Sequence, residues 1–395
     1  MTKRLALITA GSVLLGGVCL LVWLLSDRGL ETHFEPLSSS GAVTKQVPSD
    51  TAQFVDRQKC RACHQEIFEA HAHHGHASTL KRSSESRIAK QLAGRTVKDP
   101  ERDVVFQYGL NGSGELQVRS EAYSSRTWFP LQYAFGSGMH AGVTWITIIA
   151  ANTQEPIAIE HRLSWVSQDK GMRVTPGQEG RQVAQRVEIF GHAHLTKGLK
   201  QCFDCHSTHF TLKGTQIVDL RAGVGCQRCH GPGSQHVAAM EGGGSETNLR
   251  FPSENSTAMD EVRLCGICHR LPEDLSPGEI VRSNRELPRM QSVALLQSRC
   301  FTESDGLSCS TCHDPHASAH IATRASYEQT CLSCHSQPTQ TTCPTTKSQG
   351  CVQCHMPQID VNPGMLFHDH WIRIRTDQDP KPISIQDASA KPSDG

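Results

Sequence analysis

Residues 226–236 read CQRCHGPGSQH, and the first five letters form a C-x-x-C-H unit that recurs along the chain. Seven copies occur in 395 residues and contain fourteen of the 17 cysteines. Random placement of these residue types would give far less than one copy. The cysteines are Cys60, Cys63, Cys202, Cys205, Cys226, Cys229, Cys265, Cys268, Cys309, Cys312, Cys331, Cys334, Cys351 and Cys354, and the histidines are His64, His206, His230, His269, His313, His335 and His355.

The spacing within this unit matches one covalent cofactor. Two thiols three positions apart lie on one side of a helical turn, and each can form a thioether with a vinyl group of haem. The histidine that follows then reaches the haem iron as its proximal ligand. Zinc sites and redox-active proteins also use paired cysteines, but neither requires a histidine after every second cysteine. We therefore expect seven covalently attached haem c groups, held by these fourteen cysteines and seven histidines.

The N-terminal region indicates export. Residues 5–25 contain no charge, and a helix of 21 residues is about 30 Å long, the thickness of a bilayer core. Lys3 and Arg4 precede the run, which places the rest of the chain on the periplasmic side of the cytoplasmic membrane with a single-pass anchor. The alternative is a cleaved signal peptide, but the end of the run lacks the small residues that a signal peptidase requires.

The composition fits a chain organised around cofactors. Hydrophobic residues make up 37% and aromatic residues only 5% of the sequence, so side chains alone would build a thin core. We predict a mainly α fold with extensive loops wrapped around stacked haems, a smaller β-rich insert at about 100–200, and a single N-terminal transmembrane helix. Within the insert, hairpins are expected around 111–114 and around Asn152.

Changes in composition divide the chain into six segments. We expect a transmembrane anchor at 1–28, a linker at 29–55, a first cytochrome part with three haems at 56–240, a second linker at 241–260, a part with four haems at 261–375, and a disordered tail at 376–395.

Fifteen further histidines are available as sixth iron ligands. Context favours five of them, namely His76, His140, His236, His316 and His370. A histidine close in sequence to a proximal one often cannot reach the opposite face of the same haem, so we expect these residues to ligate neighbouring haems. His192, His194 and Met139 are weaker candidates, and a surface or propionate-binding role is the alternative for each histidine. Cys300 and Cys343 lie outside the motifs and are expected to form a disulfide.

Several motifs occur in an order that resembles the multihaem cytochromes of the cytochrome c-554 type, with doubled C-x-x-C-H modules. The resemblance spans most of 56–375 and rests on His76-Ala77, Pro130-Leu131-Gln132, Phe135-Gly136-Ser137-Gly138, the stretch 225–236, Cys309 to His316, and Cys354-His355-Met356-Pro357. It implies haems with two histidine ligands, periplasmic electron transfer, and distal ligand roles for His236 and His316.

These features favour an electron carrier that links a membrane dehydrogenase to a redox partner protein. We assign no catalytic residues, although the family also contains enzymes. The alternatives are an oxidoreductase that acts on a small nitrogen or sulfur compound at one open haem, and a quinol dehydrogenase. Lys and Arg together number 39, as do Asp and Glu, which argues against a nucleic-acid partner. Partners are expected to be redox proteins, the inner membrane and possible further copies of this chain.

Overall fold

The computed structural model describes residues 52–138, 142–150, 155–167, 170–244, 249–251, 255–336, 343, 350–362 and 365–383. The run at 5–25, together with Met139 and His140, lies outside these ranges. None of the helices within the described ranges has the length and apolar character needed to cross a membrane.

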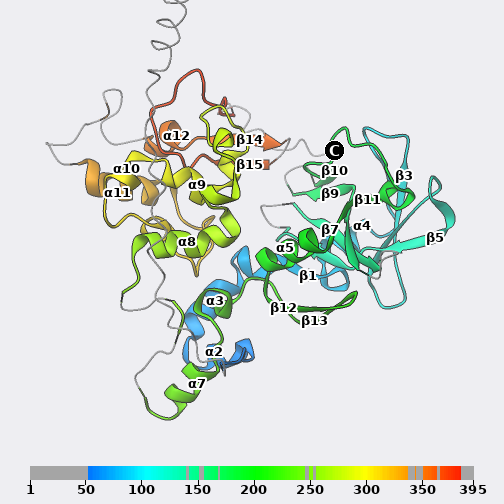
Figure 1. Ribbon diagram of the computed structural model, residues 1–395, viewed down its shortest axis with the longest axis horizontal. Coiled ribbons are helices and arrows are strands. Elements are labelled where there is room, and N and C mark those ends of the chain that lie inside the picture. Colours follow the sequence, from blue (N-terminus) through cyan, green and yellow to red (C-terminus); the bar gives the residue numbers. More distant parts are fainter. Residues whose placement is uncertain are drawn as a thin grey trace, which may run out of the picture. The chain divides into compact units, whose positions relative to one another are not determined.

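The helices are short, and most of them carry or flank a C-x-x-C-H unit (Figure 1). The α-helices are α2 (Arg57–Cys63), α3 (Gln65–Ala72), α4 (Arg87–Leu92), α5 (Thr196–His206), α6 (Cys226–His230), α7 (Ser234–Glu241), α8 (Ala258–His269), α9 (Gln291–Leu296), α10 (Arg299–Thr302), α11 (Arg324–His335) and α12 (Cys351–His355). The 3-10 helices are η1 (His76–Ser78), η2 (Ser83–Glu85), η3 (Arg186–Ile189), η4 (Pro272–Asp274), η5 (Pro277–Glu279), η6 (Leu287–Arg289) and η7 (Cys309–Thr311).

The described strands form five sheets. A five-stranded sheet has the order β1 (Leu80–Arg82), β6 (Tyr133–Phe135), β7 (Thr144–Ala150), β8 (Pro156–His161) and β11 (Gly191–His194). A four-stranded sheet contains β2 (Thr96–Lys98), β3 (Val105–Leu110), β4 (Leu116–Ser120) and β5 (Ser124–Pro130). Three two-stranded sheets pair β9 (Leu163–Val166) with β10 (Gly171–Val174), β12 (Ser207–Lys213) with β13 (Gln216–Ala222), and β14 (Gln358–Asn362) with β15 (Met365–His368).

The expectation of a mainly α protein is wrong for the described residues, of which about 35% are helical and 25% lie in strands. No transmembrane helix lies among them, and the segment 5–25, where it was expected, is outside them. Strands begin at Leu80 and return at Gln358, so they are not confined to an insert at about 100–200. The helices contribute less than expected because most motifs need only one or two turns to place two thiols and a histidine. The two hairpins are confirmed, since β3 pairs with β4 and β7 pairs with β8.

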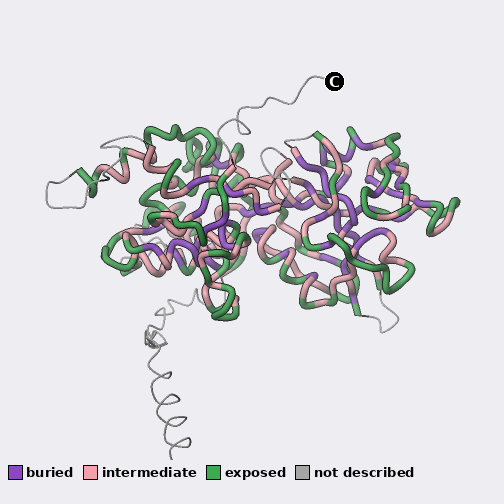
Figure 2. Tube along the Cα trace, turned by 90° about the horizontal axis from the view of Figure 1, so that it is seen from above, coloured by how far each residue is buried: buried purple, intermediate pink, exposed green. Residues whose placement is uncertain are grey.

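The side-chain core lies in the strand-rich region, where buried residues concentrate (Figure 2). Trp145, Phe106 and Phe190 are fully buried there. Arg162 is also fully buried, and its guanidinium donates to the Asp99 carboxylate at 2.8 Å, which compensates both charges. This core is built from protein alone.

Helix α5 connects that core to the second motif. Its residues Leu199 and Phe203 are fully buried and pack in a second cluster with Tyr133 and Phe135 of the five-stranded sheet. The helix ends at His206, so the packing fixes the position of the motif. By contrast, α2, α11 and α12 contain no buried residue, although each carries a motif. Their apolar partners are therefore not side chains of the described chain.

Candidate haem-binding site

One connected cavity of 3820 Å³ reaches all seven C-x-x-C-H units. The seven motif histidines line it together with thirteen of the motif cysteines, Cys202 being the exception. Divided among seven motifs, the volume is about 550 Å³ each, which falls in the range of roughly 300–1,000 Å³ that single-ligand pockets occupy. The cavity therefore has the size and the lining that several large attached cofactors require.

Hydrogen bonds fix the motif histidines in the form that binds a metal. The Nδ1 atoms of three of them lie against main-chain carbonyls: His206 on Thr79 at 3.2 Å, His230 on Phe251 at 2.6 Å, and His355 on Arg373 at 3.0 Å. A carbonyl oxygen only accepts, so Nδ1 carries the proton and donates it. The Nε2 atom is then left with a lone pair for a metal ion, as in well-ordered metal sites. The Nε2 atoms of these histidines are suitable ligands for haem iron.

Four histidines from outside the motifs each lie opposite a motif histidine. The ring centroids are 6.3 Å apart for His64 and His236, 6.0 Å for His269 and His76, 6.0 Å for His230 and His316, and 6.1 Å for His313 and His370. Metal–imidazole bonds are about 2 Å long, and each ring centroid lies about 1 Å beyond its nitrogen, so two imidazoles that share one metal ion have centroids about 6 Å apart. All four pairs show this separation.

Each of these pairs joins a motif to a histidine that follows a different motif in the sequence. His236 follows the third motif but faces His64 of the first, and His76 follows the first motif but faces His269 of the fourth. The structure therefore brings together the residues that the sequence singled out, in the crossed arrangement expected of ligands to neighbouring haems. Their coordination of iron stays a prediction.

Burial keeps two of the opposing imidazoles, those of His76 and His370, neutral. Desolvation, followed by the nearby His74, lowers the pKa of His76 to about 3, and desolvation lowers the pKa of His370 to about 4. Because only a neutral imidazole can ligate a metal, no proton has to be displaced from either residue near neutral pH.

Of the remaining histidine candidates, only His192 and His194 lie among the described residues. His140 lies outside the described residues, and its neighbours Gly136 and Gly142 line the cavity. His194, on β11, contacts the Glu160 carboxylate with its Nε2 atom at 3.2 Å, and His192 lies 3.7 Å from the Glu188 carboxylate. Neither of these two histidines lines the cavity.

The cavity-lining histidines that sequence reasoning missed include His71 on α3 and His74, which lies just beyond the end of that helix. The rings of His71 and the nearby His74 are 5.8 Å apart and almost parallel, and burial lowers the pKa of His71 to about 4. The signal was present in the HAHHGH run at 71–76, from which only the last histidine was chosen.

Contacts between cysteines show which motifs are neighbours. Three pairs of thiols from different motifs lie within hydrogen-bonding reach, namely Cys60 with Cys226, Cys205 with Cys268, and Cys265 with Cys309. Burial raises the pKa values of Cys229 and Cys331, and nearby thiols raise them further. Cys265 has this effect on the pKa of Cys229, and Cys351 and Cys312 have it on the pKa of Cys331. The neighbours therefore follow the order first, third, fourth, fifth, sixth and seventh motif, with the second motif beside the fourth.

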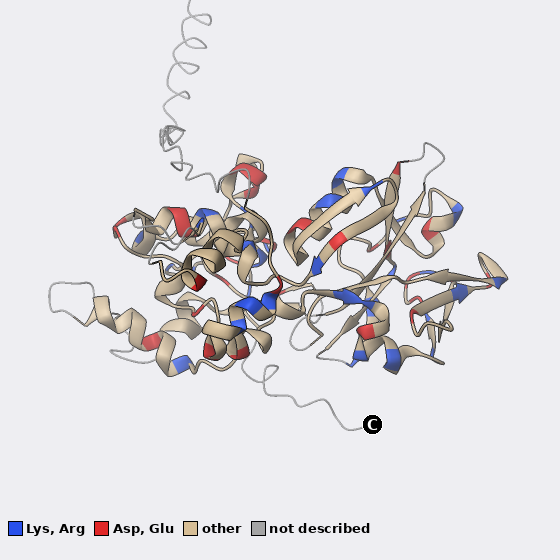
Figure 3. Cartoon of the chain, turned by 90° about the horizontal axis from the view of Figure 1, so that it is seen from below, with Lys and Arg blue, Asp and Glu red and all other residues tan. Residues whose placement is uncertain are grey.

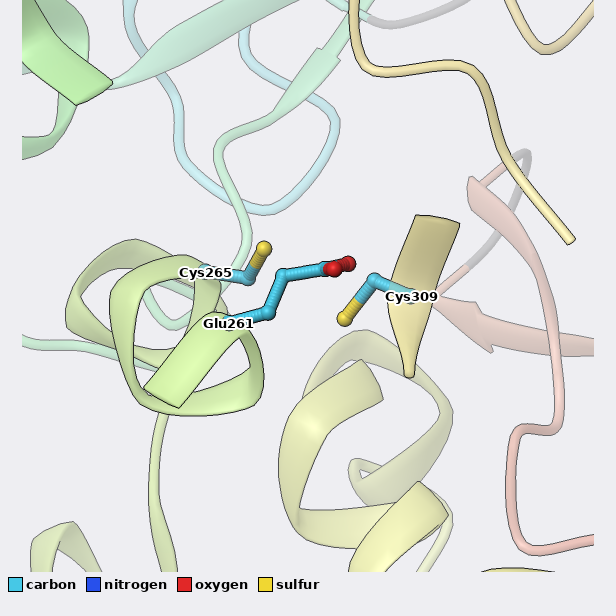
Figure 4. Close-up of side chains that lie close together, drawn as sticks. All are labelled: Glu261, Cys265 and Cys309. Atoms are coloured by element: carbon cyan, nitrogen blue, oxygen red, sulfur yellow. The ribbon is translucent and has the colours of Figure 1, made fainter. Parts of the chain in front are cut away.

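Glu261 fastens the fifth motif beside the fourth. Its carboxylate accepts from the Ser308 hydroxyl at 2.9 Å and from the Ser310 hydroxyl at 2.7 Å, and it lies close to the sulfurs of Cys265 and Cys309 (Figure 4). One carboxylate and two thiols can in principle hold a metal ion. Here both sulfurs belong to C-x-x-C-H units and the carboxylate already has donors, so the cluster is better explained as a brace between two haem attachment points.

Two features near the C-terminal motifs differ from expectation. Cys300 and Cys343 are not joined by a disulfide, and Cys300 instead lies near Cys312 and Cys334. Asp379, within the segment 376–395 that was expected to be disordered, forms an ion pair with Arg373 at 2.5 Å. The carbonyl of Arg373 is the acceptor for the seventh motif histidine, so this pair helps to place that histidine.

Comparisons with known proteins agree with this site. Residues 161–231 match the family model described as cytochrome c554 and c-prime, and residues 302–340 match the doubled CXXCH motif. The chain is 26% identical over 188 residues to the multiheme cytochrome MtrA of Shewanella baltica (strain OS185), covering 36% of this chain and 54% of that protein. It thus spans about half the length of this curated relative.

A solved structure was also found, that of the outer cell wall cytochrome OcwA. It has a TM-score of 0.46 and 14% identity, and the match covers 81% of this chain and 79% of that one. The class of protein is inferred from the two family matches, the relative MtrA and the C-x-x-C-H motifs. These matches support a multihaem c-type cytochrome with covalently bound haem c.

Proposed function

We propose that the protein is a heptahaem electron carrier on the periplasmic side of the cytoplasmic membrane. The observation that carries the proposal is that the cysteines of each motif lie within electrostatic range of those of a neighbouring motif, so that all seven motifs are linked. When bound, each haem supplies an iron that alternates between the ferric and ferrous states. The chain contributes attachment points that adjoin one another, so no motif is isolated from its neighbours.

The opposing histidines support a carrier rather than a reaction centre. In four of the seven motifs a second imidazole lies at the distance that a six-coordinate metal requires. Two histidine ligands leave no position for a substrate on an iron.

Location and partners follow from the sequence and its charge. Covalent haem c is attached outside the cytoplasmic membrane, and the uncharged segment 5–25 would hold the protein at that membrane, within reach of a membrane dehydrogenase. Basic and acidic residues are interspersed over the described elements (Figure 3). Each haem adds two carboxylates to a chain of zero formal charge, so we infer that the loaded protein is acidic and attracts a basic surface on its redox partner.

A count of iron spin states tests the carrier proposal. In the oxidised, fully loaded protein, low-temperature EPR and resonance Raman spectroscopy are expected to show low-spin, six-coordinate haem throughout. Addition of nitrite, hydroxylamine or cyanide should leave the spectra unchanged. A high-spin haem that binds one of these molecules would overturn the proposal in favour of an oxidoreductase with one open iron.

A further inference from the structure

The histidine of the fourth motif is held differently from three of the others. Its Nδ1 atom donates to the side-chain amide oxygen of Gln291 at 2.9 Å, whereas His206, His230 and His355 donate to main-chain carbonyls. A main-chain carbonyl is present whatever the residue type, but a side-chain acceptor depends on the identity of one residue. The environment of His269 is therefore open to adjustment by a single substitution.

Gln291 is well placed to act as a fixed acceptor. It is the first residue of α9, which packs against α8, the helix that ends in the fourth motif. The next four residues, 292–295, are all buried, so the start of α9 is anchored. The side chain of Gln291 itself lines the cavity, and His76 lies on the far side of His269.

The fourth motif also occupies a junction. The cysteine contacts place it beside the third, the fifth and the second motifs. The potential of a haem bound there affects every route through the protein, which makes its control more consequential than that of a haem at one end.

We propose that Gln291 is a positioning residue that sets the reduction potential of the haem attached at Cys265 and Cys268. This inference rests on the proposed function, because it requires a haem ligated by His269. A stronger acceptor at Nδ1 draws the proton away from the ring and makes the imidazole a better electron donor to ferric iron, which lowers the potential. A neutral amide gives an intermediate value, and loss of the acceptor raises the potential.

The test uses two substitutions with opposite expected effects. In Gln291→Glu a carboxylate replaces the amide with nearly the same shape, and in Gln291→Leu the acceptor is removed. Spectroelectrochemical titration of the fully loaded protein is expected to show one redox component shifted to lower potential in the first variant and to higher potential in the second. The other components should keep their potentials, and low-spin EPR signals should be retained.

Gln297→Glu is the matched control. Gln297 caps the other end of α9 and also lines the cavity, but no hydrogen bond joins it to a motif histidine among the described contacts. An equal shift in this control would contradict the proposal by showing that added charge alone is sufficient. Absence of any shift in both Gln291 variants would also contradict it and would leave the carrier function intact. If intact mass shows fewer than seven haems on the unmodified protein, the proposed function itself fails.

Discussion

Replacing His76 by alanine is expected to convert one low-spin haem to the high-spin form, and that haem is the one attached at Cys265 and Cys268. The reason is that His76 lies opposite His269, with ring centroids 6.0 Å apart, although the nearest motif in sequence is the one that ends at His64. Removal of the imidazole leaves that iron with one protein ligand. EPR and resonance Raman spectra of the oxidised variant should show one high-spin iron among seven.

Two further variants make this result specific. His73→Ala removes an exposed histidine from the same segment and should leave all irons low-spin. In a background that carries Cys265→Ala and Cys268→Ala, the His76 substitution should produce no additional high-spin signal, because the affected haem is already missing. A high-spin signal that persists in this background would place His76 on another haem and contradict the crossed pairing.

The double substitution Cys265→Ala and Cys268→Ala is expected to interrupt electron transfer through the protein. Among the described cysteine interactions, those that join the first and third motifs to the fifth, sixth and seventh run through the fourth motif. Its loss should leave six haems that no longer equilibrate as one pool. Stopped-flow reduction should then separate into phases, with the two haems on the first side distinct from the three on the other.

The same change at the end of the series provides the control. Cys351→Ala with Cys354→Ala also removes one haem. Among the described motif cysteines, those of the seventh motif interact only with the sixth, so the interactions among the remaining motifs are kept. This variant should be reduced with the same kinetic pattern as the unmodified protein and with an amplitude lower by one seventh. If both double variants retain a single phase, the order of motifs derived from the cysteine contacts is wrong.

The crossed pairs also bear on how the chain folds. Helices α2, α11 and α12 contain no buried residue, and the histidine pairs join motifs that are far apart in sequence. The apolar surface that a helix normally needs for stability is therefore expected to come from the cofactors. The strand-rich region differs, because Trp145, Phe106 and Phe190 form a core made of protein alone.

Structural features were predicted correctly from the sequence where a short local motif has a single chemical interpretation. The C-x-x-C-H units predicted haem c, and the turn at 111–114 predicted the pairing of β3 with β4. Four of the five favoured distal histidines lie opposite motif histidines, and the fifth, His140, lies outside the described residues. The short motifs that contain these histidines, such as Asp314-Pro315-His316, can be recognised from the sequence alone.

Features that depend on tertiary contacts were missed. The amount of strand was underestimated because short strands such as β1 and β6 are defined by their partners rather than by their own three residues. The role of Gln291 could not be predicted, since it lies 22 positions from His269 and no motif connects the two. The expected pairing of Cys300 with Cys343 failed because it rested only on their being left over.

The central claim is that seven covalently attached haems share one continuous protein scaffold. Intact-mass spectrometry under denaturing conditions tests it most directly, because thioether bonds survive unfolding whereas ligand bonds do not. The predicted result is a single species with the mass of the chain plus seven haems. A species with six haems or fewer in fully matured protein would contradict the account, since at least one motif would then serve another purpose.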